Sequence, residues 1–425
     1  MVALILSAAP VFSIAQSGVR TAQLGGGMFD NIVWLIFFMV FMLFYPRLMI
    51  TQMLWKLEQS ALQMEGMAVK TRNIVLKKIS SRPDMKTRNS VTNFLETIAI
   101  LPKDLDPYGV VPKIDHIVKL YRNRFKYFAD EIAPDMTEEE KANLTGGLSG
   151  AIAMNQIAKL VRHWVELIRK TKNLQLALVL QMQLPLIEMI AKAVVDGTEA
   201  MTNGWPVGDG AGPMVASRLI GSSRITKTYK DEEMIVVKKR MRGRSVIIMR
   251  AKGPGGRIGD LGKTVVDAVK RNKVAKIITI DAASKLEGER TGSIAEGVGV
   301  AIGGIGTDSF VIEEIAVKKN LPLDAYAIKM SQEEAIQPML PSVVTATKAV
   351  ARMVEESIGK TGKGKTGKAK GRGAILVVGV GNCSGIANNA SGVEDAEALA
   401  KKVQQTVSER KKKEKKSVFK FLIGR

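Results

Sequence analysis

Carboxylates lie beside glycine-rich turns at three places in the C-terminal half of the sequence. Asp209 lies in VGDGAGP (207–213), Asp281 follows the β-branched run IITI, and Glu296 lies in EGERTGSIAEGVGVAIGG (287–304). Two carboxylates in one cleft can share a proton, so that one activates water while the other donates to a leaving amine. Carboxylates beside glycine turns are what a catalytic or ligand-binding cleft would require, so Asp209, Asp281 and Glu296 are candidate site residues.

The turns themselves indicate where a ligand would bind. Because glycine has no Cβ, the backbone at these positions can approach a substrate or metal closely. A further turn, GPGGRIGDLGKT (253–264), precedes a predicted helix and could hold an anion at its amides. The predicted ligand-binding residues are Gly208, Gly210, Gly212, Gly255, Gly256, Glu287, Glu289, Gly303, Gly304 and Asn382.

A structural interpretation of the same acidic residues stays open. Asp209 can cap the helix predicted directly after it, because a short acidic side chain accepts hydrogen bonds from the first free amides of a helix. Asp281 and Glu287 can form salt bridges with Lys285 and Arg290. Under this interpretation the acidic residues stabilise the fold and perform no catalysis.

The cysteine and histidine content limits which disulfides, metal sites and thiol nucleophiles the protein can have. Cys383 is the only cysteine, which excludes an internal disulfide and a zinc site built from cysteine and histidine. The two histidines, His116 and His163, lie outside the glycine-rich region, so we predict no metal site, and the sequence identifies no cofactor. Cys383 could be a reactive thiol, but the domain around it has no histidine to activate it.

Residues 206–335 resemble the spore germination endopeptidases. The resemblance rests on IITIDAASKLEGERTGSIAEGVGVAIGGIGTDSFVIEE, on LPLDAYAIKMSQEEA, and on VGDGAGPMVA, which is similar to the Gly-Asp-x-x-Gly-Pro turn of that family. The hydrogenase-maturation proteases have a related turn. The resemblance implies a peptidase-type α/β domain in which the aspartates of the family fall on Asp209 and Asp281, and its acidic strand position falls on Glu296.

A second segment resembles the hydrogenase-maturation proteases. ILVVGVGNCSGIANN (375–389) is similar to their first strand and turn, but it lies near the end of the domain. A circular permutation would explain this position and would bring Asn382 beside Asp209. As a whole, the chain resembles an uncharacterised archaeal family of membrane-anchored proteins, classed only as a domain of unknown function, which implies no particular activity.

The spacing of apolar residues predicts the elements that position these side chains. In residues 204–407, short β-branched runs such as EMIVVKK, RSVIIMR, KIITIDA and AILVVGV alternate with helical stretches. This alternation predicts an α/β domain with a mostly parallel sheet flanked by helices. A Gly/Lys-rich loop, 359–373, interrupts the domain before its last strand.

Residues 51–203 predict a helical region. Apolar residues recur there at three- and four-residue spacing, as expected for helices that pack on one another. Thr137 followed by Glu140 predicts a capping box at the start of one of these helices.

Residues 28–50 are predicted to form a transmembrane helix. The run IVWLIFFMVFMLFY (32–45) is apolar throughout, and with its flanks it reaches the roughly 20 residues needed to cross hydrocarbon. Aromatic residues near both ends suit the membrane interface. A core helix buried in protein is the alternative.

The flanking charges predict the orientation of this helix. Segment 47–88 carries nine Lys/Arg and three acids, whereas Arg20 is the only Lys or Arg in residues 1–31. The positive-inside rule therefore predicts a single-pass protein of the cell membrane, with its N-terminus outside and its bulk in the cytoplasm. Residues 1–27 are predicted to be a signal-like or extracytoplasmic segment; whether part of it is cleaved stays open.

Most of the net charge of +22 at pH 7 lies in flanking segments. Segments 47–88, 359–372 and 409–425 each carry a net charge of +6. These segments, including the basic tail 408–425, could contact anionic lipid headgroups or a polyanion such as ribosomal RNA. Simple solvation of the charged segments is the alternative.

These inferences combine into one functional prediction and one alternative. We predict a membrane-anchored, cytoplasm-facing, peptidase-like hydrolase of unknown substrate, with Asp209 and Asp281 as the acid/base pair and Glu296 in support. A protein is one candidate substrate. The alternative is a non-catalytic membrane scaffold or ligand-binding protein that recruits a polyanionic or protein partner. The sequence identifies neither the substrate nor the oligomeric state.

Overall fold

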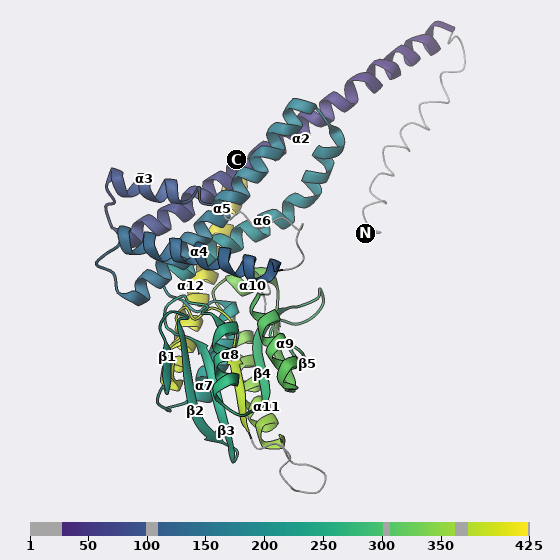
Figure 1. The fold of residues 1–425 in the computed structure, drawn as a ribbon. Coiled ribbons are helices and arrows are strands. Elements are labelled where there is room, and N and C mark those ends of the chain that lie inside the picture. Colours follow the sequence, from purple (N-terminus) through teal and green to yellow (C-terminus); the bar gives the residue numbers. More distant parts are fainter. Residues whose placement is uncertain (1–27, 99–108, 301–306, 362–372, 424–425) are drawn as a thin grey trace. The chain divides into compact units, whose positions relative to one another are not determined.

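The computed structural model describes residues 28–98, 109–300, 307–361 and 373–423 (Figure 1). The described chain forms two compact units. One contains the residues up to Ala61 together with Val161–Leu184, and the other contains Leu62–Leu160 together with Pro185 and the residues after it. The predicted extracytoplasmic segment 1–27 and most of the Gly/Lys-rich loop lie outside the described residues.

The first unit contains the apolar part of helix α2 (Met28–Ile79). The side chains from 32 to 45 are exposed, and the helix is long and apolar enough to cross a membrane. Its Glu58 carboxylate pairs with Arg162, 2.6 Å away, and with Arg169, both on α5 (Glu138–Thr171). α2 is therefore a candidate membrane span.

Helix α6 (Leu174–Thr202) is a second candidate span by length and composition. Its most apolar stretch is 28% buried, whereas that of α2 is not buried at all. α6 is therefore the weaker candidate of the two, because a partly buried apolar helix is also what the core of a soluble bundle contains.

The second unit includes a small helical bundle. Helices α3 (Met85–Phe94) and α4 (Val110–Ile132) and parts of α2 and α5 bury a common apolar cluster that includes Phe94, Phe125 and Leu148. The predicted capping box is present at the start of α5, where Thr137 Oγ1 accepts from the Glu140 N–H and the Glu140 carboxylate accepts from the Thr137 N–H.

Glycines allow α5 and α6 to pack closely in this unit. A Cβ on Gly147 or Gly150 would overlap the hydroxyl groups of Thr202 and Thr198 of α6. These glycines thus leave room for the threonines of α6, and α5 continues through them as one helix.

The second unit also contains a seven-stranded sheet with the order β1-β2-β3-β7-β4-β6-β5 (Figure 1). The strands are β1 (Lys227–Tyr229), β2 (Met234–Met241), β3 (Arg244–Ala251), β4 (Val274–Ser284), β5 (Ile294–Val298), β6 (Leu323–Met330) and β7 (Ala374–Gly379).

The sheet is mixed, so the prediction of a mostly parallel sheet is wrong. β3, β7, β4 and β6 run parallel to one another, but β1–β2, β2–β3 and β5–β6 are antiparallel pairs. The reason lies partly in Arg242 and Gly243, which join β2 to β3 with φ angles of 49° and 78°. Two consecutive residues with positive φ form the tight turn of an antiparallel hairpin.

Helices cover both faces of this sheet. On one face, α7 (Ala211–Ile220), α11 (Pro341–Lys360) and α12 (Ala390–Ile423) pack against alternate strand residues such as Ile278 and Ile280. On the other face, α8 (Leu261–Arg271) and α9 (Thr307–Lys319) pack against Ile277 and its neighbours. The described part of the predicted basic tail forms the end of α12.

Two short helices complete the domain. The 3-10 turn η2 (Gly208–Gly210) leads directly into α7, and α10 (Gln332–Ile336) follows β6. η2 contacts both α10 and β4, the strand that contains Asp281.

Candidate functional site

Asp281 lies in the C-terminal part of the interior strand β4, three residues before its end. Its side chain is 2% exposed, and its carboxylate accepts a 2.6 Å hydrogen bond from the Ala282 N–H. The Val380 N–H, just after β7, donates a 2.9 Å hydrogen bond to the Ile280 carbonyl. Val380, directly after β7, therefore lies beside Ile280 and Asp281 of β4. We term this end of the sheet, where the parallel strands finish, the carboxyl edge.

Asp209 reaches the carboxyl edge from η2. Its Oδ2 accepts a 2.8 Å hydrogen bond from the backbone N–H of Asn382, in the loop that follows β7. Gly381 has a φ of 126°, and a Cβ there would overlap the Asp209 carbonyl oxygen. Asn382 therefore lies beside Asp209, the arrangement that a permuted domain predicts.

Glycines before and in α7 bring this helix onto the strand ends. A Cβ on Gly212 would overlap the carbonyl oxygens of Val380 and Ile280, and one on Gly208 would overlap the Glu334 carbonyl. A Cβ on Gly210 would contact Ile386 and the Asn382 carbonyl. The space beside these glycines is thus filled by the protein's own atoms, and their observed role is close packing.

The environment of Asp209 favours its protonated form. Burial raises the pKa of Asp209 above its ordinary value, and the hydrogen bond from the Asn382 N–H opposes this only in part. A buried carboxyl that holds a proton at a pH where ordinary aspartates have lost theirs can act as a general acid.

The structure separates Glu296 from Asp281. Ile280, Tyr326 and Glu296 form one cross-strand row, and the Tyr326 hydroxyl donates to Glu296 at 3.1 Å. Tyr326 and Ile280 belong to the core under α7 and α11. Since neighbouring residues of a strand point to opposite faces, Asp281 faces the α8–α9 side. Glu296 is therefore on the other face of the sheet from Asp281.

The loop between β4 and β5 contains polar contacts that sequence reasoning missed. The Thr291 hydroxyl lies 2.7 and 2.8 Å from the two Glu334 carboxylate oxygens and 3.1 Å from the Lys285 ammonium nitrogen. Ser331 and Glu334 form a capping box at the start of α10. The spacing of this serine and glutamate was the sequence signal that could have identified Glu334.

The other acidic residues of this loop face outward or pair locally. Glu289 pairs with Lys329 and accepts a 2.7 Å hydrogen bond from the Leu286 N–H, which together lower its pKa. Glu287 is exposed. Gly303 and Gly304 lie outside the described residues.

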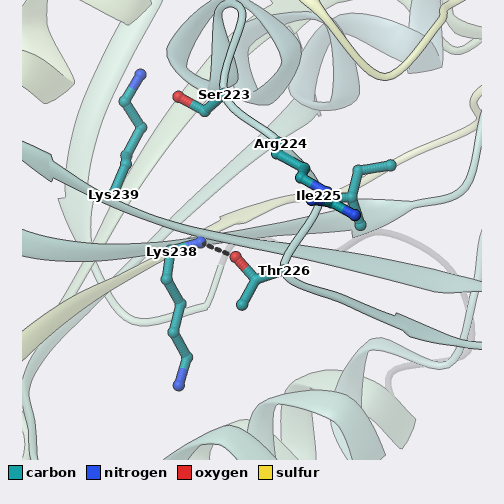
Figure 2. A pocket seen from close by; sticks show the side chains of 6 residues that line it. All are labelled: Ser223, Arg224, Ile225, Thr226, Lys238 and Lys239. Atoms are coloured by element: carbon teal, nitrogen blue, oxygen red, sulfur yellow. Dashed lines mark hydrogen bonds between the residues drawn. The ribbon is translucent and has the colours of Figure 1, made fainter.

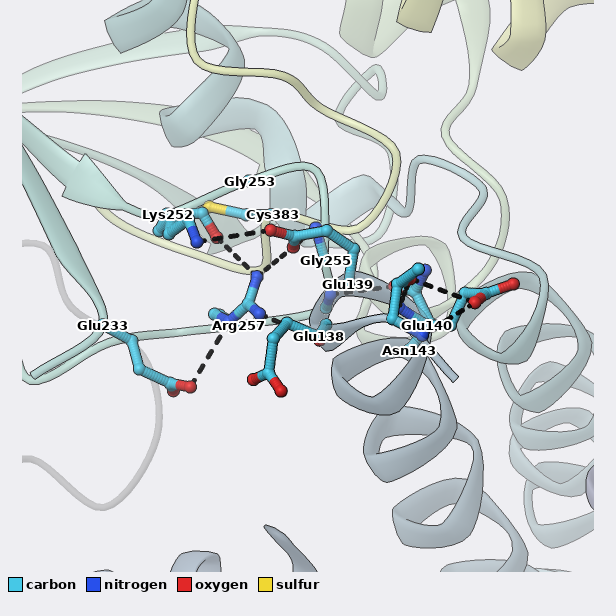
Figure 3. Close-up of polar contacts among 12 residues, drawn as sticks. Glu138, Glu139, Glu140, Asn143, Glu233, Lys252, Gly253, Gly255, Arg257 and Cys383 are labelled. Carbon is cyan, nitrogen blue, oxygen red and sulfur yellow. Dashed lines mark hydrogen bonds and ion pairs between the residues drawn. The ribbon is translucent and has the colours of Figure 1, made fainter. Parts of the chain in front are cut away.

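The GPGGR turn (253–257) does bind a carboxylate, but one from the protein itself. The Gly255 N–H donates to Glu139 at 3.1 Å, and the Gly256 N–H donates to the Asn143 side-chain oxygen at 2.9 Å (Figure 3). Glu139 and Asn143 lie in the first turns of α5. The predicted ligand-binding residues Gly255 and Gly256 are therefore occupied by this helix.

Cys383 lies in the loop after β7 and is fully buried. Its thiol lies 3.2 Å from the Ala251 carbonyl oxygen, and burial raises the pKa of the thiol. A buried thiol with a raised pKa is a poor nucleophile. Cys383 therefore packs as a small apolar side chain in this structure.

Two further properties of the described residues bear on ligands. No group of three or more His, Cys, Asp or Glu side chains in this part of the chain is arranged to hold a metal ion. A shallow cavity of about 480 Å³ lies between β2 and the segment before β1, lined by Ser223, Arg224, Ile225, Thr226, Lys238 and Lys239 (Figure 2). Its lining is basic, so it differs in chemistry from the carboxyl edge.

The comparisons with known proteins identify the family. Residues 31–204 match the N-terminal domain of a protein of unknown function, DUF1512, and residues 207–387 match the C-terminal domain of the same family. The α/β domain with its acidic carboxyl edge is thus the C-terminal domain of that family, and the chain belongs to the DUF1512 family. No curated protein and no solved structure matches the chain significantly.

Proposed function

We propose that this protein is a membrane-anchored hydrolase of the peptidase type, with Asp209 and Asp281 as its acid/base pair. One observation carries the proposal. Asp209, with a pKa raised by burial, comes to the same sheet edge as Asp281 although the two lie on different segments. Two carboxyl groups with different environments at one edge are the arrangement that acid/base hydrolysis requires.

The raised pKa of Asp209 suggests which aspartate is the acid and which is the base. Asp281, as the base, would remove a proton from a water molecule that attacks the substrate carbonyl carbon. Asp209, protonated, would donate its proton to the leaving amine nitrogen as the C–N bond breaks. The pair regains its starting state when Asp281 releases the proton it took up and Asp209 takes up a proton in return, directly or through solvent. Glu296, on the other sheet face, has no direct part in this scheme.

We also propose that α2 anchors the domain to the cell membrane with its N-terminus outside. Support comes from the exposed apolar side chains in the first part of α2 and from the lysines and arginines that follow this apolar part. Basic side chains just after a span bind anionic headgroups on the cytoplasmic side. The hydrolase would then act on protein substrates at the cytoplasmic membrane face.

Cleavage assays on the full-length protein in nanodiscs test this function. Unfolded and membrane-bound protein substrates are incubated with wild type, Asp209→Asn, Asp281→Asn and the control Glu313→Gln, which changes an exposed acid on α9 of the same domain. We expect turnover to fall at least about 100-fold in the two asparagine variants, the scale of general acid–base catalysis. Turnover by the control should equal that of wild type. Equal turnover by wild type and Asp281→Asn would exclude the hydrolase.

A non-catalytic scaffold is the second candidate, and one observation favours it. The glycines around Asp209 pack against the protein's own backbone, and the Asp209 carboxylate is hydrogen bonded within the fold. In a scaffold these contacts would only hold α7 on the sheet, while the basic segments recruit a polyanionic or protein partner. Full stability of Asp209→Asn without any measurable turnover in wild type would favour this candidate.

A further inference from the structure

A buried arginine links the helical bundle to the α/β domain. Arg257, which is 7% exposed, pairs with Glu139 of α5 and donates a 2.9 Å hydrogen bond to the Glu138 carbonyl (Figure 3). Its Nε lies 3.3 Å from the Glu233 carboxylate. A buried guanidinium needs such partners, because leaving it uncompensated in the protein interior is strongly unfavourable.

Glu139 is the centre of these contacts. Besides Arg257, it accepts from the Gly255 N–H at 3.1 Å and lies 3.5 Å from the Lys252 ammonium group. Burial alone would raise its pKa, but the hydrogen bond and charge of Arg257 outweigh this and lower the pKa of Glu139. The Glu139 carboxylate therefore holds the GPGGR turn through two donors, the Gly255 N–H and the Arg257 guanidinium, and also pairs with Lys252 directly before the turn.

The GPGGR turn in turn holds the 381–388 loop. The Cys383 N–H donates to the Arg257 carbonyl at 3.0 Å, and the Gly385 N–H donates to the Pro254 carbonyl at 2.8 Å. Gly253 and Asn388 exchange two hydrogen bonds of 2.9 Å. Four backbone or side-chain hydrogen bonds thus fix this loop to the turn.

The same loop carries the donor to Asp209. Asn382, whose N–H binds the Asp209 carboxylate, directly precedes Cys383, whose N–H binds Arg257. A displacement of the turn would therefore be passed to the Asp209 hydrogen bond through one peptide unit. Glu139 is far from Asn382 in sequence. Two hydrogen bonds, from Arg257 to Glu139 and from Cys383 to Arg257, nevertheless connect it to the residue next to Asn382.

We propose that Glu139 is a positioning residue for Asp209, acting through Arg257 and the 381–388 loop, so that the helical domain of the family sets the geometry of the site in its α/β domain. This inference rests on the proposed function only for its catalytic meaning. The mechanical link itself depends on contacts that can be tested without a substrate.

Cys383 provides the test, because it is the only cysteine of the chain and is fully buried beside this link. Full-length protein in nanodiscs is treated with N-ethylmaleimide, and the modification rate is followed by intact mass. Glu139→Gln keeps the shape of the side chain but removes its charge. We expect it to raise the modification rate about tenfold or more, the scale of one lost charged hydrogen bond.

The second measurement is the pKa of Asp209, followed by carboxyl ¹³C NMR. A general loss of stability would speed the modification of Cys383 without shifting this pKa in the same way. Glu139→Gln should raise the pKa of Asp209, because the Asn382 N–H that opposes the effect of burial is no longer held in place. The matched control is Glu138→Gln. Residue 138 accepts its hydrogen bond from Arg257 at the backbone carbonyl, which this substitution does not change. It should leave both readouts at their wild-type values.

Each result decides the proposal. Wild-type values of the Cys383 rate and of the Asp209 pKa in Glu139→Gln would overturn it. If Glu139→Gln fails to fold, Asn143→Ala, which removes only the 2.9 Å hydrogen bond to the Gly256 N–H, should give smaller changes in the same direction, and no change would overturn the link. If Glu139→Gln changes both the Cys383 rate and the Asp209 pKa but the wild-type protein cleaves no substrate, the hydrolase function is excluded and the positioning role of Glu139 stands.

Discussion

The backbone N–H of Asn382 donates a 2.8 Å hydrogen bond to the carboxylate of Asp209, across 173 positions of sequence. This bond joins the loop after β7 to the turn before α7, and it is the contact that places Asp209 at the ends of the central strands. Because Gly381 and Gly212 allow the two segments to approach closely, the position of Asp209 depends on backbone packing as much as on its own side chain.

The raised pKa of Asp209 predicts how stability depends on pH. The group has an ordinary pKa of 3.8 and a higher one in the folded protein. Its contribution to stability is therefore fully present below about pH 3.8 and is lost as the pH rises through the folded pKa. Asp209→Asn, which keeps an oxygen that can accept from Asn382, removes this loss.

Thermal unfolding at acidic and neutral pH checks this prediction. Relative to wild type, Asp209→Asn should gain stability as the pH rises from about 4 to 8. A difference between the two proteins that is the same at both pH values would contradict the raised pKa.

The close approach of α7 predicts that Gly212 tolerates no side chain. Gly212→Ala would place a methyl group on the carbonyl oxygens of Val380 and Ile280, so we expect a loss of about 3 kcal/mol or more in the free energy of unfolding, or failure to fold. The control is Gly66→Ala in α2, where a Cβ meets no atom within 4 Å. That change should stabilise the helix by up to about 1 kcal/mol. Similar effects of the two substitutions in denaturation experiments would show that α7 is not packed as described.

The anchoring role of α2 predicts a strong effect of charge in its middle. Phe38 is 59% exposed in an apolar stretch. An arginine near the centre of a span costs about 3 kcal/mol on insertion scales. Phe38→Arg should therefore move much of the protein out of the membrane fraction after cell lysis. Leu286→Arg, at an exposed apolar position of the α/β domain, should leave the fraction unchanged, and an equal distribution of the two variants would argue against α2 as the anchor.

The general architecture could be predicted from sequence because it depends on local patterns. The apolar run of α2, the helical spacing of α4 to α6, the capping box at Thr137 and the β-branched runs of β2, β3, β4 and β7 all correspond to observed elements. Strand direction is a different matter. The antiparallel β2–β3 pair depends on the two-residue turn at Arg242 and Gly243, and a turn of Arg-Gly is a weaker hairpin signal than Asn-Gly or Asp-Gly.

The partners of the site residues could be predicted less well, because they come from distant segments. The resemblance predicted Asn382 beside Asp209, and the hydrogen bond between them follows that arrangement. The GPGGR turn showed the chemistry of an anion site, but nothing local indicated that Glu139, more than 100 residues earlier, supplies the anion. Likewise, the alternation of side chains along β5 and β6 separates Glu296 from Asp281 only once the register of the strands is known.

The central claim is that the Asp209 and Asp281 carboxyl groups share one site, and titration of Asp209 in Asp281→Asn tests it most directly. The measurement is the pKa of the Asp209 carboxyl by ¹³C NMR in full-length wild type and in this variant. Two ionisable groups that share one site influence each other's titration, so Asp281→Asn should change the pKa of Asp209. An unchanged pKa would mean that the two groups do not sense each other across the sheet edge, which would contradict the account.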